Sequence, residues 1–168
     1  LYPHKPYNSP LLGETTYRKH KENLEFGTAQ YDMIDNWCSQ INMDWFASCF
    51  DIKSIDFMKR YEPKYWKLPS PCLINYEVSK YMAEQDGVML FSVGMSSIED
   101  VDKAYTTIVE TRKGNKGRLV MMHCCSEYPT PIDHVNLLNI PMLQERYHIN
   151  IGYSSHDAGV PCSVAAVA

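Results

Sequence analysis

The sequence lacks a basic excess and a long apolar run. Its 168 residues carry 16 Lys and Arg against 20 Asp and Glu, a formal net charge of −4. A general nucleic-acid or anionic-membrane binder usually carries a basic excess, so we expect no nucleic-acid and no membrane partner. No apolar stretch approaches the roughly 20 residues that span a bilayer, and we expect no export leader. Length, 45% hydrophobic and 21% charged residues are ordinary for one globular domain.

Paired cysteines are also missing, because no CxxC motif occurs. The six cysteines are Cys38, Cys49, Cys72, Cys124, Cys125 and Cys162. Scattered thiols in apolar segments are typical of a reduced, cytoplasmic protein rather than of a disulfide framework. The run of His123, Cys124 and Cys125 has the residue types of a zinc site. Neighbouring residues of a strand point to opposite faces, however, which disfavours one ion shared by the two cysteines.

The two ends are untypical of a complete protein, and we expect a fragment. Residue 1 is Leu rather than Met, and residues 162–168 (CSVAAVA) stop inside an apolar stretch with no cap. Residues 1–27 are polar and contain Pro3, Pro6, Pro10 and Gly13. We predict that they form an N-terminal loop segment that precedes the first strand.

From residue 28 onward, strand-like and helical segments alternate. We predict strands at 44–50, 64–68, 87–93, 117–124 and 148–154. We predict helices at 28–42, from 51, at 74–85, 96–113 and 139–147, and from 161. Continuous apolar strands between amphipathic helices indicate a parallel sheet buried on both faces. Both a doubly wound sheet and a (β/α)₈ barrel fit this pattern.

A serine lies near the carboxyl end of each of the five predicted strands or just after it. These serines are Ser48, Ser70, Ser92, Ser126 and Ser154. Barrel enzymes build their active sites at the carboxyl ends of the strands, so the recurrence favours a barrel. The predicted fold class is therefore α/β, a partial (β/α)₈ TIM barrel with about five βα units across 28–168, truncated at both ends. Each serine taken alone could equally be a helix cap.

Several motifs resemble the sialic acid (N-acetylneuraminate) synthase family. They are LEFGTAQY, FASCFD, SVGMSSIEDV, HCCSEYPTPIDHVNL and IGYSSHDAGVPCSVAAVA, in this order within residues 17–168. The resemblance implies a barrel of which this chain holds strands three to seven, and a homodimeric full-length enzyme. It also implies condensation of phosphoenolpyruvate with N-acetylmannosamine, or its 6-phosphate, to N-acetylneuraminate, or its 9-phosphate, and phosphate. Manganese or magnesium would polarise the sugar aldehyde.

The resemblance assigns roles to individual residues. The positions that match phosphoenolpyruvate contacts are Lys67, Ser48, Ser70, Ser92, Ser126 and Ser154. Tyr128 matches a tyrosine that lines the sugar side, and His156 matches one of two metal-binding histidines. The second metal ligand would lie outside this chain. Without the resemblance, Lys67 could be a snorkelling strand-end lysine and His156 a surface residue.

Cys72 departs from the family pattern. The family has an acidic residue after strand four that is thought to act in acid–base steps, and this chain has PSPC there. A thiol has a pKa of about 8.5 and is mostly neutral at pH 7, so Cys72 is the weakest catalytic candidate. The alternatives are a legionaminic or pseudaminic acid synthase, or a non-catalytic homologue that retains only the phosphate-binding cradle.

Overall fold

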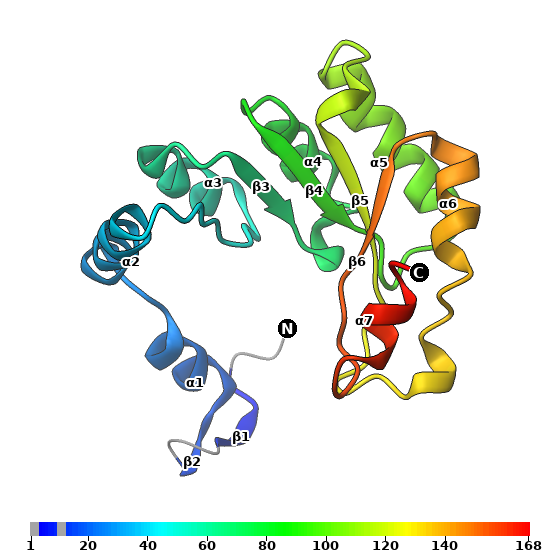
Figure 1. Ribbon diagram of the computed structural model, residues 1–168. Helices are drawn as coiled ribbons and strands as arrows, with labels where there is room; N and C mark the ends of the chain where they lie inside the picture. Colours follow the sequence, from blue (N-terminus) through cyan, green and yellow to red (C-terminus); the bar gives the residue numbers. More distant parts are fainter. Residues whose placement is uncertain (1–3, 10–12) are drawn as a thin grey trace. The chain divides into compact units, whose positions relative to one another are not determined.

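The computed structural model describes residues 4–9 and 13–168. The chain divides into two compact units, Leu1–Met43 and Asp44–Ala168, and each is described by itself (Figure 1). The predicted boundary lay between residues 27 and 28. The helix that begins at residue 28 belongs instead to the first unit.

The first unit starts with a β-hairpin and a helix rather than with a loop. Strands β1 (Pro6–Ser9) and β2 (Gly13–Thr16) pair antiparallel, and helix α1 (Tyr17–Leu24) follows. The prediction of a loop over 1–27 is therefore wrong for 6–9 and 13–24, while Pro3 and Pro10 lie outside the described residues. The hairpin tolerates Pro6 because a proline at the first position of an edge strand interrupts no ladder hydrogen bond. Thr16 caps α1 by accepting from the Lys19 N–H at 3.2 Å.

Helix α2 (Thr28–Gln40) confirms the predicted helix at 28–42 to within two residues. Its N-cap is Gly27, and Thr28 is the first helical residue. No side chain of α2 is buried. Trp37 and Ile41, for example, are 56% and 65% exposed.

The second unit contains a parallel sheet in the order β3-β4-β5-β6. Its strands are β3 (Tyr65–Leu68), β4 (Val88–Ser92), β5 (Leu119–His123) and β6 (Asn150–Tyr153). The strand predicted at 44–50 is wrong, because this segment forms only an isolated parallel bridge between Ser48 and Lys67. A single backbone hydrogen bond, from the Cys49 N–H to the Lys67 carbonyl at 3.1 Å, holds it there.

Helices alternate with these strands, as predicted. They are α3 (Ile52–Met58), α4 (Tyr76–Ala83), α5 (Ile98–Thr111), α6 (Asn139–Tyr147) and α7 (Pro161–Ala165). Short 3₁₀ turns occupy Lys59–Tyr61, Ser70–Cys72, Lys116–Arg118 and Ile132–His134. Asp51 caps α3 as expected, and Ser97 forms a capping box with Asp100 at the start of α5. No helix within residues 4–9 and 13–168 has the length and apolarity needed to cross a membrane.

The two faces of the sheet differ in burial. Helices α4, α5 and α6 lie together on one side (Figure 1). The buried apolar side chains of the strands there are Trp66, Leu68, Met89, Phe91, Leu119 and Met121. Alternate residues such as Lys67, Leu90 and Met122 point to the opposite face and are only half-buried. The expectation of burial on both faces is therefore wrong for this chain, since four strands do not close around the inner face as eight do.

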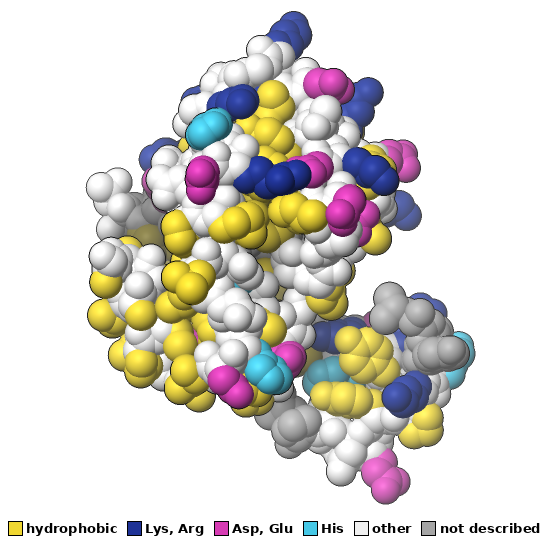
Figure 2. Space-filling model, turned by 90° about the vertical axis from the view of Figure 1, so that its right-hand side faces the viewer, with side chains coloured by type: hydrophobic (Ala, Val, Ile, Leu, Met, Phe, Trp, Pro, Cys, Tyr) yellow, Lys and Arg dark blue, Asp and Glu magenta, His cyan; other side chains and the backbone are white. Residues whose placement is uncertain are grey.

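Exposed apolar side chains gather around the loop after β5 and around α7. Figure 2 shows hydrophobic side chains clustered on the lower part of the larger unit. The most exposed ones in these segments are Tyr128, Ile132, Leu138, Val160, Val164 and Val167. These segments follow the carboxyl ends of strands β5 and β6, where the candidate site lies.

Candidate active site

Four residues at the carboxyl ends of the strands share one face of the sheet. Lys67 lies in β3, Ser92 ends β4, and Cys124 and Ser154 directly follow β5 and β6. The register pairs Lys67 with residue 90, residue 92 with 122, and residue 122 with 152. Because side chains alternate along a strand, all four point to the half-buried face.

Lys67 is a cation without a carboxylate partner. Its Nζ makes a short hydrogen bond to the Ser92 hydroxyl and a long one, 3.5 Å, to the Leu68 carbonyl. None of the ion pairs formed by residues 4–9 and 13–168 includes Lys67. Burial lowers the pKa of the Lys67 ammonium because the charged form has lost part of its hydration. An anion that binds beside Lys67 would therefore meet an uncompensated positive charge.

Three more side chains converge at Gly94, two residues beyond β4. The Gly94 N–H donates to Ser70 Oγ at 3.1 Å, and Ser70 Oγ lies 3.1 Å from Cys124 Sγ. A Cβ atom at Gly94 would lie 2.6 Å from Ser126 Oγ, 2.8 Å from Cys124 Sγ and 3.0 Å from Ser70 Oγ. The absence of a side chain at Gly94 thus lets Ser70, Cys124 and Ser126 approach one another.

We call the group Lys67, Ser70, Ser92, Gly94, Cys124 and Ser126 the Lys67 cradle. The Lys67 ammonium and the serine hydroxyls provide several donors for one anion, whereas the Gly94 N–H is already bonded to Ser70. The predicted residues Lys67, Ser70, Ser92 and Ser126 all belong to this cradle. Gly94 and Cys124 were missed as site residues, although the glycine two positions after Ser92 was a usable indication of close approach.

Two of the predicted serines lie at the margin of the cradle. Ser48 is exposed and reaches β3 only through its backbone bridge to Lys67. Ser154 is half-buried on the cradle face, and its backbone N–H donates to the His123 carbonyl at 2.8 Å. Their assignments as phosphoenolpyruvate contacts remain predictions.

Tyr128 and His156 form a stacked pair on neighbouring loops. Their ring centroids are 4.0 Å apart, and the Tyr128 hydroxyl lies 2.9 Å from His156 Nε2. The other ring nitrogen, Nδ1, lies against the Cys125 carbonyl. A carbonyl can only accept, so Nδ1 carries the proton and Nε2 accepts from the Tyr128 hydroxyl. Tyr128 is 76% exposed, which leaves the pair accessible from solvent.

The donor set for a metal ion is partial in this chain. Neutral His156, protonated at Nδ1, has the tautomer in which Nε2 can bind a cation. Across the described ranges, no three His, Cys, Asp or Glu side chains are grouped closely enough to hold a metal ion. His123 donates from Nε2 to the Val135 carbonyl at 2.7 Å, so its ring serves packing. His156 therefore fits as one ligand, and further ligands must come from elsewhere.

Asp157 anchors the loop that carries His156, a role missed in the sequence. Tyr153 donates a short hydrogen bond to Asp157 Oδ1, and Ser155 Oγ donates to the same oxygen at 2.7 Å. These hydrogen bonds, the one from Tyr153 first, lower the pKa of Asp157 from 3.8 to about 2. The Thr130 N–H donates to the His156 carbonyl at 2.9 Å and ties the loop to the one after β5.

We expect Asp157→Asn to lower the melting temperature relative to the parent at pH 7. In acid, the difference in melting temperature between the two proteins should become smaller. A carboxyl whose folded pKa is depressed stabilises the fold above its unfolded pKa and loses that effect as pH falls through the folded pKa. The gap should therefore shrink between about pH 4 and pH 2, because the folded pKa is about 2. Thermal melts of both proteins across this range provide the measurement. Asp133→Asn in an exposed turn is the control, and a gap independent of pH would contradict the expectation.

Cys72 lacks the properties that the acid–base role expected at its position requires. Its thiol donates to the Phe50 carbonyl at 3.2 Å and is 7% exposed. Burial, and to a lesser degree Asp51, raises the pKa of the Cys72 thiol. The group is therefore a neutral thiol at pH 7, hydrogen-bonded to the backbone.

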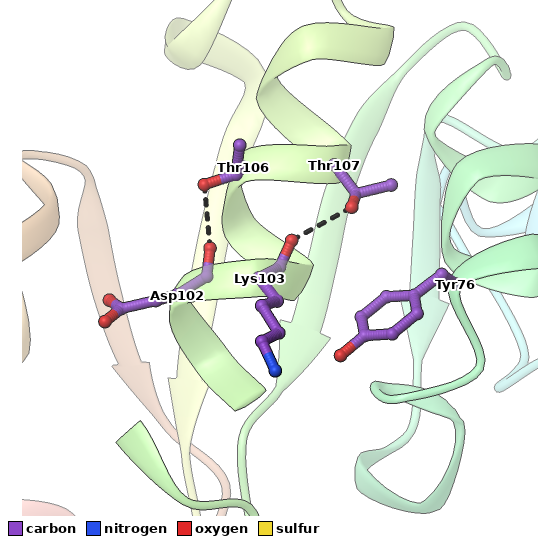
Figure 3. Close-up of a pocket in the computed structure, with 5 residues that line it drawn as sticks. All are labelled: Tyr76, Asp102, Lys103, Thr106 and Thr107. Carbon is purple, nitrogen blue, oxygen red and sulfur yellow. Dashed lines mark hydrogen bonds between the residues drawn. The ribbon is translucent and has the colours of Figure 1, made fainter. Parts of the chain in front are cut away.

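Two cavities differ in their relation to the cradle. One of about 420 Å³ lies between α4 and α5 on the outer side of the helices, lined by Tyr76, Asp102, Lys103, Thr106 and Thr107. Figure 3 shows that both threonine hydroxyls donate back to carbonyls of α5, at 2.8 and 2.9 Å, so neither is free for a ligand. Another cavity of about 360 Å³ includes Cys124 and Ser126 in its wall and adjoins the cradle.

Comparison with known proteins shows which family this chain resembles. The model of the NeuB family matches residues 4–168. An N-acetylneuraminate-9-phosphate synthase of Drosophila melanogaster is 34% identical over 97% of this chain and 43% of its own length. An N,N'-diacetyllegionaminic acid synthase of Campylobacter jejuni is 28% identical over 88% of this chain and 44% of its own length. The chain spans less than half the length of these curated relatives.

A solved structure supports the fold. The spore coat polysaccharide biosynthesis protein SpsE of Bacillus subtilis superposes with a TM-score of 0.78 at 28% identity, over 85% of this chain and 40% of that chain. The parallel sheet with helices on one face thus corresponds to part of a TIM-barrel-like synthase. With a family match along nearly all of its residues, the chain belongs to the NeuB family.

Proposed function

We propose that the protein to which this chain belongs condenses phosphoenolpyruvate with an N-acetylated amino sugar. The sugar is N-acetylmannosamine or its 6-phosphate, and the products are N-acetylneuraminate or its 9-phosphate and phosphate. The observation that carries the proposal is Lys67, an ammonium with no carboxylate partner among the described ion pairs, hydrogen-bonded to Ser92. Such a site suits the phosphate of phosphoenolpyruvate.

The cradle and the Tyr128–His156 pair divide the work between two substrates. Lys67, Ser70, Ser92 and Ser126 hold and orient the phosphate, and Ser154 on the same face is a further contact. Tyr128 lies 76% exposed beyond the end of β5, where a sugar can approach it. Holding both substrates on one rigid sheet converts an encounter of two molecules into a reaction within one complex. The new carbon–carbon bond joins the enol carbon of phosphoenolpyruvate to the aldehyde carbon of the sugar.

His156 is the residue of this chain suited to a divalent cation. A bound Mn²⁺ or Mg²⁺ supplies Lewis acidity that polarises the sugar aldehyde. In the neutral ring, the hydrogen bond from Nδ1–H to the Cys125 carbonyl leaves the free lone pair on Nε2 and fixes the ring plane. The Tyr128 hydroxyl, 2.9 Å from Nε2, would release this nitrogen to a cation. We further propose a cytoplasmic protein, in accord with six free cysteines and no paired-cysteine motif. From the family resemblance alone, we also propose a homodimer.

The test is an assay of the protein expressed from the open reading frame that encodes this chain. With Mn²⁺, phosphoenolpyruvate and either N-acetylmannosamine or its 6-phosphate, we expect release of phosphate and formation of a nonulosonic acid, detected by mass spectrometry. If neither sugar yields product while phosphoenolpyruvate still binds, the condensation with these sugars is refuted.

A legionaminic or pseudaminic acid synthase is the alternative enzyme. The Campylobacter jejuni relative is named as an N,N'-diacetyllegionaminic acid synthase. Such enzymes share the phosphoenolpyruvate half of the site, so the Lys67 cradle does not separate them. The same assay with the corresponding diacetylated amino sugars decides, because only the true acceptor should give a high kcat/KM.

A non-catalytic homologue is the alternative outside the enzymes, and Cys72 favours it. A buried neutral thiol that donates to the Phe50 carbonyl is a weaker proton-transfer group than a carboxylate. We expect the natural protein to turn over without change at Cys72. If product forms only after Cys72→Glu, the natural sequence is a phosphate-binding relic.

A further inference from the structure

Gly94 and Cys124 surround the Ser70 hydroxyl in a way that phosphate binding by serines alone does not explain. The Gly94 N–H donates to Ser70 Oγ at 3.1 Å, and Cys124 Sγ lies 3.1 Å from the same oxygen. Ser70 and Cys124 are 9% and 6% exposed, so water does not readily replace either partner. The hydroxyl therefore has two neighbours at hydrogen-bond distance, of which one is certain to donate.

The hydrogen-bond donors around Ser70 limit the directions in which the Ser70 hydroxyl proton can point. A serine hydroxyl donates one proton and accepts with two lone pairs. The Gly94 N–H occupies one lone pair. When the Cys124 S–H occupies the other, the Ser70 proton must point away from both. Among the described residues that proton then has no acceptor, since Ser70 Oγ makes no hydrogen bond besides those with Gly94 and Cys124.

We propose that Gly94 and Cys124 are positioning residues that direct the Ser70 hydroxyl proton into the Lys67 cradle, toward a phosphate oxygen. This inference rests on the proposed function, in which the cradle holds phosphoenolpyruvate. A phosphate offers only acceptors to its surroundings, so a hydroxyl fixed as a donor adds a charge-assisted hydrogen bond. The hydroxyl is then already oriented before the phosphate binds, so binding does not have to order it.

Gly94 has a second requirement, which is the lack of a side chain. A Cβ atom there would lie 2.6 Å from Ser126 Oγ and 2.8 Å from Cys124 Sγ, closer than real Cβ atoms approach other atoms. Gly94→Ala must therefore displace one of these side chains from the cradle. Gly117 offers a matched control, because its added Cβ would meet only Asn115 Oδ1, at 3.7 Å.

The experiment compares Cys124→Ala, Cys124→Ser, Gly94→Ala and Gly117→Ala in the protein expressed from the whole open reading frame. Calorimetry gives the Kd of phosphoenolpyruvate and of inorganic phosphate, and steady-state kinetics gives kcat and the KM of each substrate. We expect Cys124→Ala to raise both Kd values and the KM of phosphoenolpyruvate roughly 3- to 10-fold, the loss of about one hydrogen bond, with the sugar KM unchanged. Cys124→Ser should restore binding because its O–H still donates. Gly94→Ala should exceed Cys124→Ala, and Gly117→Ala should match the parent.

Three outcomes would overturn the inference. The first is that Cys124→Ala binds both anions with the affinity of the parent. The second is that Cys124→Ser binds them as weakly as Cys124→Ala does. The third is that the KM of the sugar rises as much as the KM of phosphoenolpyruvate, which a general packing defect would produce. If Gly94→Ala does not fold, the two Cys124 variants decide alone. Binding is measured without turnover. If anion binding depends on Cys124 but no condensation occurs, only the proposed function is refuted. If condensation occurs and the Cys124 substitutions leave anion binding unchanged, only the inference is refuted.

Discussion

Replacing Lys67 by methionine should lower kcat/KM for phosphoenolpyruvate by roughly 100-fold, without lowering the melting temperature. The magnitude follows from removing one preorganised charged donor from a partly desolvated site. Stability should hold or rise, because burial already penalises the Lys67 charge and none of the described ion pairs offsets it. A methionine of similar length keeps the packing of the aliphatic stem.

The Lys67 prediction separates binding from folding by two measurements. Inorganic phosphate should raise the melting temperature of the parent, because a ligand that binds only the folded state stabilises it, and should leave Lys67→Met unchanged. Lys103→Met is the matched control, since Lys103 is exposed on the outer side of α5. Equal losses of kcat/KM in both variants, or a phosphate shift retained in Lys67→Met, would show that Lys67 is not the anion-binding cation.

Replacing Phe91 by alanine should reduce the free energy of unfolding by about 3–5 kcal/mol, the usual cost of deleting a buried aromatic side chain. Phe91 is completely buried in β4, where the register places it between Leu68 and Met121. Total stability of a domain is about 5–15 kcal/mol, so this one change should remove a large part of it.

Urea unfolding followed by circular dichroism provides the measurement for Phe91→Ala. Phe50→Ala deletes the same atoms from a side chain that is 58% exposed. The control should change the free energy of unfolding by less than about 1 kcal/mol, as surface substitutions do. Similar losses at both positions would mean that the buried face of the sheet is not the stabilising core.

The alternation of strands and helices was predictable because it depends on local periodicity. Four of five predicted strands and the helices at α2 to α7 occur where the apolar pattern placed them. The error at 44–50 has a local cause as well. An apolar run does not reveal whether a neighbouring strand pairs with it. In this segment the pairing is limited to one bridge, between Ser48 and Lys67. The hairpin of 6–9 and 13–16 was missed because its strands are largely polar and the first begins with a proline.

Local residue patterns were sufficient to predict the βα order, the approximate helix bounds and the candidates near the strand ends. Each of these depends on residues within a few positions of one another. Only the tertiary structure decided which candidates meet. The Lys67–Ser92 hydrogen bond, the convergence on Gly94 and the tautomer of His156 join residues 24 to 54 positions apart. Such contacts follow from strand register and from backbone carbonyl positions, and neither is written in local residue patterns.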